Sequence, residues 1–195
     1  MRLEEVHLLH YFSNLYTDTM PYSPLNIEAL FSDKSLKPKI KTETLSGWIL
    51  DGLISVEELI AFAGSKKDPV KATCMEALEF ATKQYPGIAS ENLLVFATEG
   101  LTSSAPRTKW ESAKVIGNIA HIMPDGLEPA VKNLLVNTSH EGTVVRWSAA
   151  DALAEILKCG TRLNKSLIPR IEAIMDKEEK DSIKKIYRAG LKKIN

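Results

Sequence analysis

Apolar residues along the chain recur at intervals of three and four positions, which is the period of an amphipathic α-helix. Almost no stretch shows the alternation of a half-buried strand. Helix-breaking residues interrupt the pattern at regular intervals: Asp68-Pro69, Pro86-Gly87, Ala105-Pro106, Pro124-Asp125-Gly126 and Glu141-Gly142. The segments between these breaks are roughly 11–19 residues long, enough for packed helices. The pattern therefore predicts an all-α chain.

Some of these segments repeat one another. The similar stretches are VKATCMEALEFA (70–81), TKWESAKVIGNIA (108–120) and VRWSAADALAEIL (145–157). Each has a Lys or Arg near its start and a small residue three positions later, namely Cys74, Ser112 and Ala149. The offsets between these positions are 38 and 37, and a further step of 37 reaches IKKIYRAGLKKI (183–194). We expect the recurring small residue to face the interior in every repeat.

A shorter apolar segment follows each long one, at 55–64, 88–101, 127–137 and 164–176. The unit is therefore a helix pair of roughly 37 residues, and such pairs must stack to bury their apolar faces. Alanine at the centre of 145–157, at positions 149 and 152, would let neighbouring helices approach closely, because packed cores tolerate little added volume.

This pattern resembles the HEAT-repeat family, in particular the short HEAT-like repeats of bacterial proteins. The resemblance rests on V-[KR]-x-x-[small]-x-x-[AV]-[LI] and on PDGLEPAVKNLL (124–135), which looks like a HEAT loop and second helix. It covers residues 68–195 well and 38–67 loosely, with 40–50 as a weak echo, and it does not reach 1–37. The resemblance implies a right-handed α-solenoid of stacked antiparallel helix pairs, an α-α superhelix, and it says little about function.

A chain of 195 residues favours one domain. Within 1–195 we expect an irregular N-terminal cap and first repeat at 1–67 and regular repeats at 68–195. The Pro-rich segment 17–40 should be a loop with one short helix at 25–31, serving either as a cap or as a regulatory or partner-binding arm.

The helix at 178–194 should close the C-terminal end. Its apolar spacing predicts docking through Ile183, Ile186, Tyr187 and Ile194. Its basic residues Lys184, Arg188 and Lys192 should face water.

The most distinctive polar stripe lies opposite the alanine-rich one. It holds Trp147 and Asp151, followed by Glu155 and Lys158, and the equivalent stripe one repeat earlier holds Trp110 and Lys114, followed by Asn118 and His121. One interpretation packs both indoles between repeats, since tryptophan is mostly buried in proteins. The other is a partner-binding patch formed by Trp110, Lys114, Trp147 and Asp151, because tryptophan is enriched at interface hot spots.

A second resemblance concerns chemistry. Bacterial alkylpurine DNA glycosylases are also built from HEAT-like repeats and hold a damaged nucleotide with tryptophans and a carboxylate. Trp147 and Asp151, with Arg188 in the next repeat, look like that arrangement, in which a carboxylate stabilises positive charge on the sugar. Ser148 stands where a second acid would be expected, which leaves the motif incomplete.

Charge and composition bear on whether the protein binds nucleic acid, spans a membrane or is secreted. Lys and Arg number 25, as do Asp and Glu, so no overall basic field favours nucleic acid or a membrane. Residues 144–195 nevertheless hold twelve basic against seven acidic groups, which suits a solvated helix face or a nucleic-acid patch. No run approaches the roughly eighteen apolar residues of a membrane span. Glu4 and Glu5 stand where a signal peptide would be apolar, and we expect a cytoplasmic protein.

Metal and cofactor chemistry finds little support in the sequence. His7 and His10 share a helical face near Glu4, but no third or fourth ligand is evident. Cys74 and Cys159 are isolated and fit packing positions. No nucleotide-binding or hydrolase motif is present. We therefore expect no metal, no cofactor and no catalytic residue. The sequence favours a non-catalytic scaffold that binds a protein or peptide, with a nucleic-acid-binding protein, such as an alkylpurine DNA glycosylase, as the alternative.

Overall fold

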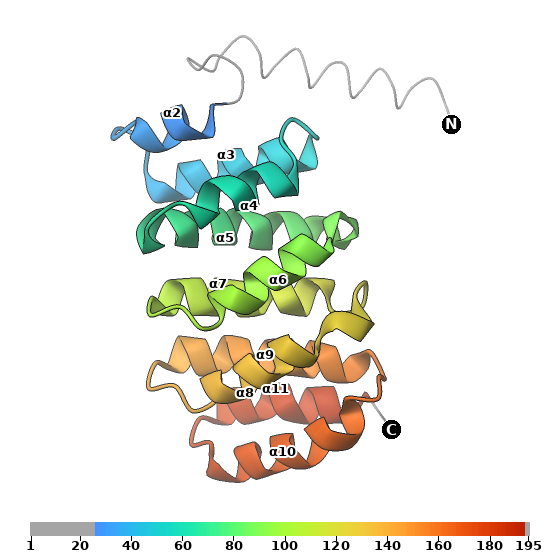
Figure 1. Ribbon diagram of the computed structural model, residues 1–195. Coiled ribbons are helices and arrows are strands. Elements are labelled where there is room, and N and C mark those ends of the chain that lie inside the picture. The colour runs from blue at the N-terminus through green and yellow to red at the C-terminus, as the bar shows by residue number, and fades with distance from the viewer. Residues whose placement is uncertain (1–25, 194–195) are drawn as a thin grey trace, which may run out of the picture.

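The computed structural model describes residues 26–193, and its helices in this range stack in two layers (Figure 1). The first, the A layer, contains α3 (Pro38–Leu50), α5 (Asp68–Gln84), α7 (Pro106–Ile119), α9 (Thr143–Lys158) and α11 (Asp181–Leu191). The second, the B layer, contains α4 (Val56–Gly64), α6 (Glu91–Gly100), α8 (Glu128–Asn137) and α10 (Asn164–Lys177). The short turns η1 (Pro86–Ile88) and η2 (Pro124–Gly126) precede α6 and α8, and α2 (Ile27–Ser32) lies beside α3.

Helix starts follow from local chemistry. Pro38, Pro69 and Pro106 occupy the first turns of α3, α5 and α7, where the missing N–H costs nothing and the fixed φ suits a helix. Helix α4 begins with a capping box, in which the Ser55 side chain accepts from the Glu58 N–H and the Glu58 carboxylate accepts from the Ser55 N–H. These signals fix where each helix of a pair begins.

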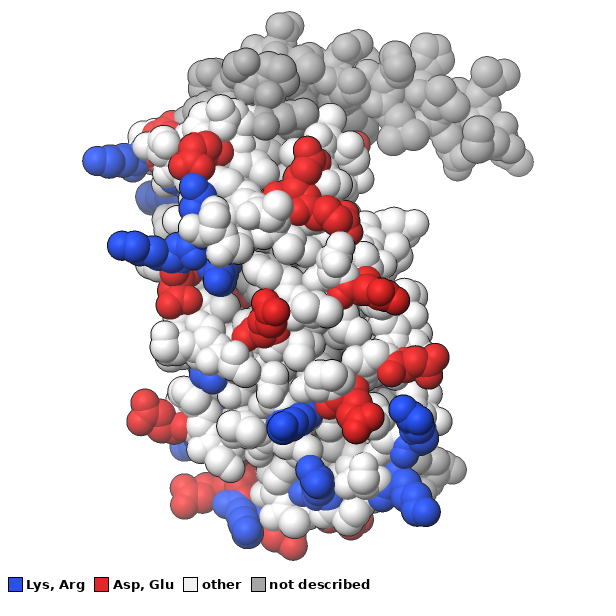
Figure 2. Space-filling model, viewed as in Figure 1, with Lys and Arg blue, Asp and Glu red and all other residues white. Residues whose placement is uncertain are grey.

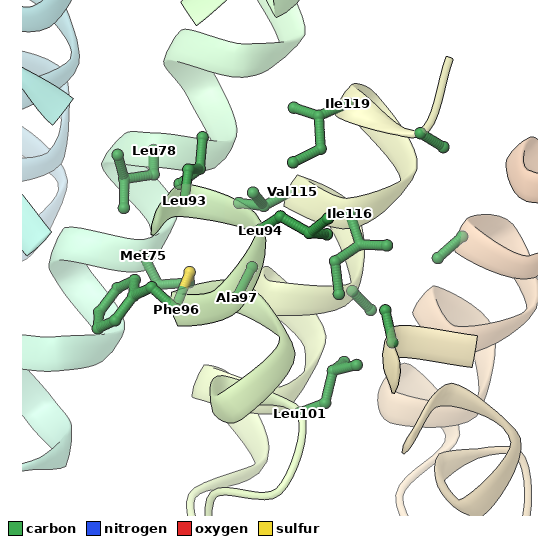
Figure 3. Packing of buried hydrophobic residues seen from close by; sticks show 14 of the residues in the cluster. Met75, Leu78, Leu93, Leu94, Phe96, Ala97, Leu101, Val115, Ile116 and Ile119 are labelled. Atoms are coloured by element: carbon green, nitrogen blue, oxygen red, sulfur yellow. The ribbon is translucent and has the colours of Figure 1, made fainter. Parts of the chain in front are cut away.

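The recurring small residues face the interior, as predicted. Cys74, Ser112 and Ala149 each have an exposed fraction of 0%. In the same interior, apolar side chains of α5, α6 and α7 interdigitate, with Met75 and Leu78 beside Leu93 and Phe96 (Figure 3). The repeat register read from the sequence is therefore confirmed.

Adjacent A helices approach one another at residues without large side chains. A Cβ added to Gly117 would lie 3.4 Å from the Cα of Ala152, and one added to Gly190 would lie 3.0 Å from the Cα of Ala154. Both alanines are buried in α9. This close approach is the physical reason for alanine at the centre of α9, since a larger residue would push the repeats apart.

The N-terminal part of the described chain contains a helix pair and a short preceding helix. The expected helix at 25–31 is observed as Ile27–Ser32, and α3 begins at Pro38, ahead of the expected weak echo at 40–50. Phe31 stacks on Phe62 with ring centroids 5.3 Å apart, and the Lys41 amine donates to the Phe31 carbonyl. These contacts hold α2 on the first pair. Residues 1–25, with His7 and His10, lie outside the described residues.

At the other end, α11 docks on α9 through Ile183 and Tyr187, which are 0% and 1% exposed. Ile186 is half-buried, and Ile194 lies outside the described residues. Arg188 and Lys192 are exposed as expected, whereas Lys184 is half-buried. Lys184 directly follows Ile183 and is therefore at the border of the docked face.

No helix among residues 26–193 is long and apolar enough to cross a membrane.

Candidate partner-binding surface

The side of α7 and α9 opposite their buried stripes carries the four residues singled out from the sequence. We call this face, formed by Trp110, Lys114, Trp147 and Asp151, the tryptophan surface. The stacking of α7 on α9 places Trp110 and Lys114 one repeat from Trp147 and Asp151, in the same helical phase. Trp147 has an exposed fraction of 40%, and the other three are half-buried.

Trp110 and Lys114 are engaged within the protein. The Trp110 indole N–H donates to Glu111 Oε1 at 2.7 Å. The Lys114 amine lies 3.0 Å from Glu111 Oε2 and 3.2 Å from Glu79 Oε2, which belongs to α5. One lysine is therefore shared between two buried carboxylates from adjacent repeats.

The electrostatics of this cluster follow from burial. Burial raises the pKa of Glu79 above its ordinary value, against the attraction of Lys114. For Lys114 burial acts to lower the pKa, but the charges of Glu111 and Glu79 outweigh it and raise the pKa. The lysine is thus fixed in its charged form and is committed to internal pairs.

Trp147 and Asp151 differ from that pair. Among residues 26–193 the Asp151 carboxylate has no hydrogen bond and no ion pair, and neither does the Trp147 indole N–H. Glu155, the next acid on this stripe, is paired with Lys158. Burial and then the Glu155 charge raise the pKa of Asp151 above its ordinary value. Asp151 is thus a partly desolvated carboxylate beside an exposed indole.

The remaining polar residues of the two stripes have plainer roles. The Asn118 amide donates to the Glu79 carbonyl and to Thr82 Oγ1, which ties α7 to α5. His121 is exposed. Outside the two stripes, in the turn before α9, His140 Nδ1 accepts from the Gly142 N–H. These contacts stabilise turns and helix packing.

Two of the three recurring basic residues, Lys109 and Arg146, anchor loops. The Lys109 amine donates to the Leu101 carbonyl and to Asn137 Oδ1. Arg146 donates to the carbonyls of His140 and Glu141 and pairs with the buried Glu178 at 3.0 Å. Sequence reasoning found the recurrence but not this role, which depends on loop carbonyls that no sequence pattern displays.

No group of three or more His, Cys, Asp or Glu side chains within residues 26–193 is placed to hold a metal ion. Cys74 is buried, and burial raises the pKa of its thiol to about 12. Cys159 is half-buried, and burial and the Glu155 charge raise its pKa as well. Neither thiol is activated as a nucleophile.

Solved structures share this arrangement of helices. A computationally designed armadillo repeat protein for modular peptide recognition superposes with a TM-score of 0.67 at 14% identity, over 87% of this chain and 81% of that one. An engineered protein superposes with a TM-score of 0.65 at 17% identity, over 87% and 79%. A second designed armadillo repeat protein gives 0.63 at 14% identity, over 87% and 81%. No family model matches the sequence, and no curated protein does.

At these identities the likeness establishes the fold alone. The predicted fold class, an all-α solenoid of stacked antiparallel helix pairs, is confirmed. The chain therefore has the fold of an armadillo-like repeat solenoid.

Proposed function

We propose that this solenoid, a short HEAT-like repeat protein, is a non-catalytic scaffold that binds a protein or peptide on its tryptophan surface. The observation that carries the proposal is the exposed Trp147 beside Asp151, whose carboxylate is partly desolvated and pairs with no described residue. The acids next to this surface, Glu79, Glu111 and Glu155, are paired with lysines.

Trp147 and Asp151 can each form interactions that the described residues do not supply. Tryptophan offers a large rigid area and is typical of interface hot spots. A carboxylate that has lost water without gaining a partner regains free energy when a donor from another molecule reaches it. The internally paired Trp110 and Lys114 then form the fixed edge of the contact, and Trp147 and Asp151 form its open part.

The fold supports peptide binding in a general way. Stacked repeats place equivalent positions side by side along an extended surface, which suits a chain segment. A designed armadillo repeat protein of this fold was made for modular peptide recognition. We propose that this chain binds a peptide in a comparable way.

A nucleic-acid role remains the second candidate, because Arg188 is exposed on the A helix that follows Trp147 and Asp151. The surface itself disfavours this role. Glu79, Glu111, Asp151 and Glu155 lie in or next to it, and a phosphate backbone is bound by basic rather than acidic groups.

The test is an affinity selection from a library of random displayed peptides, with the Trp147→Ala protein used to remove clones that bind elsewhere. We expect clones that bind wild type and lose at least about tenfold in affinity on Trp147→Ala or Asp151→Asn, a change of about 1.4 kcal/mol. Tyr85→Ala is the matched control, since Tyr85 is an exposed aromatic residue at the end of α5. It should leave binding unchanged.

Two results would overturn the proposal. One is a selection that yields no clone sensitive to either substitution. The other is release of alkylated bases from methylated DNA by wild type and not by Asp151→Asn, which would establish the glycosylase alternative.

A further inference from the structure

A second surface lies in the B layer, away from the tryptophan surface. Helices α4 and α6 enclose a shallow hollow of about 340 Å³, here called the α4–α6 groove. Its principal lining residues are Glu57, Ile60, Ala61, Val95, Phe96 and Glu99. A smaller hollow of about 280 Å³ adjoins it and shares Phe96 and Glu99.

The floor of the groove is apolar and accessible. Val95 is 56% exposed although it is a branched apolar residue in the middle of α6. Phe96 is nearly buried and packs beside Met75 of α5 (Figure 3). The exposed valine and the neighbouring buried phenylalanine both line the groove and give it an apolar contact area.

The rim of the groove carries two acids, Glu57 and Glu99, and the adjoining hollow also contains Asp68 and Lys71. Helices α4 and α6 carry Glu57, Glu58, Glu91 and Glu99 and no Lys or Arg. Glu58 serves in the capping box, whereas the other three form no ion pair with any residue from 26 to 193. On this face the basic side chains gather along one edge and over the C-terminal repeats (Figure 2). The position of Val95 in the repeat is taken in α8 by Lys132, so the apolar floor is not repeated there.

We propose that the α4–α6 groove docks a segment of a separate protein in which an apolar side chain is flanked by lysine or arginine. The apolar side chain covers Val95 and Phe96, and the basic groups pair with Glu57 and Glu99 on the two walls. Complementary charge steers such a partner and selects against acidic ones. The same negative rim repels nucleic acid and anionic membranes.

The chain's own segments fit the groove less well. Residues 1–25 contain Arg2 against Glu4, Glu5 and Asp18, so they do not complement an acidic rim. The basic helix α11 has its apolar residues Ile183 and Tyr187 already buried against α9. Exposed apolar residues next to lysines occur at Ile40 beside Lys39 and at Val136 one turn from Lys132, so a second copy that presents them is an outcome of the test below.

The experiment selects displayed random peptides on the full-length protein and depletes the pool on the Glu57→Lys/Glu99→Lys protein. Peptides that survive should be rich in Lys or Arg around an apolar residue. They should lose at least about tenfold in affinity on Glu57→Lys/Glu99→Lys and on Val95→Glu, and bind more weakly as salt rises to about 0.5 M. Glu172→Lys, an exposed charge reversal on α10, should change nothing, and neither should Trp147→Ala. Melting temperatures of all variants establish that they fold.

The inference is overturned if no selected peptide discriminates between wild type and the groove variants, or if those that discriminate carry no excess of basic residues. Self-association of wild type that the groove variants abolish, measured by analytical ultracentrifugation, would replace the separate partner with a second copy. Because Trp147→Ala is assayed in parallel, failure here is distinguishable from failure of the tryptophan surface.

Discussion

The Nζ of Lys114 lies 3.2 Å from the Oε2 of Glu79, so a lysine of one repeat is paired with a buried carboxylate of the repeat before it. The Glu79 side chain is 2% exposed and that of Lys114 is 29% exposed. The same amine also serves Glu111. This shared lysine supports the part of the tryptophan surface that is fixed.

Replacing Lys114 with Met should lower the free energy of unfolding by about 2–3 kcal/mol at neutral pH, because it leaves two buried carboxylates without their cation. Urea unfolding measures this change. Lys158→Met is the matched control, since the Lys158–Glu155 pair is far more exposed and should contribute at most about 0.5 kcal/mol. Equal losses in the two variants would contradict the role given to Lys114.

The effect of Lys114→Met should also depend on pH. The folded-state pKa of Glu79 is raised above the ordinary value of 4.5, so the folded protein binds this proton more tightly than the unfolded chain. The stability contribution of Glu79 therefore falls as pH rises from 4.5 through the folded pKa. Removing Lys114 raises that pKa further. Unfolding across a pH series should show the gap between wild type and variant widening with pH. A constant gap would show that the ion pair is not its cause.

The charged carboxylate of Asp151 should lower the free energy of unfolding. Burial and Glu155 raise its pKa above the ordinary value of 3.8, so its charge destabilises the fold increasingly as pH rises from that value through the folded pKa. We expect Asp151→Asn to stabilise the protein at neutral pH by up to about 1 kcal/mol, since partial exposure screens the effect. The difference should vanish in acid, as judged by thermal unfolding. A less stable Asn variant at neutral pH would mean that the carboxylate is already satisfied within the protein.

Substituting alanine for two glycines, one at a close contact between helices and one in open space, tests how tightly the repeats stack. A Cβ on Gly190 would lie 2.9 Å from the Cβ of Ala154, so Gly190→Ala should force α11 away from α9 and cost about 1–3 kcal/mol. Gly47, inside α3, meets nothing within 4 Å, and Gly47→Ala should instead gain about 0.5–1 kcal/mol from helix propensity. Chemical denaturation of both variants checks the opposite signs. Equal shifts would mean that helix propensity alone governs both sites.

The architecture was predictable because small residues recur at equivalent positions of the repeats. Cys74, Ser112 and Ala149 recur in phase, and a buried position between close helices accepts only small side chains. The helix starts were predictable from proline and from the capping box. The start of α3 carries the same proline signal at Pro38, but the weak repeat pattern there led us to expect a loop through residue 40.

The candidate site was predictable only in part. The helical phase brought Trp110 and Trp147 to one face, but it could not tell that the Trp110 indole is bonded to Glu111 while Trp147 is open. The burial of Glu79 was missed because glutamate is rarely buried unless it is paired, and its partner lies in another repeat. The spacing of Glu111 and Lys114, three positions apart on one helix, was the signal that could have found half of this network.

The central claim, that Trp147 and Asp151 form the open part of a partner-binding surface, is tested most directly by the fluorescence of Trp147 itself. In the protein with Trp48→Phe and Trp110→Phe, Trp147 is the sole tryptophan. Titration with a peptide selected for binding to the tryptophan surface should shift its emission to shorter wavelength as the partner covers the indole, and Asp151→Asn should weaken the titration at least about tenfold. Emission that stays unchanged while the peptide still binds, as followed by fluorescence polarisation of a label on the peptide, would contradict the account.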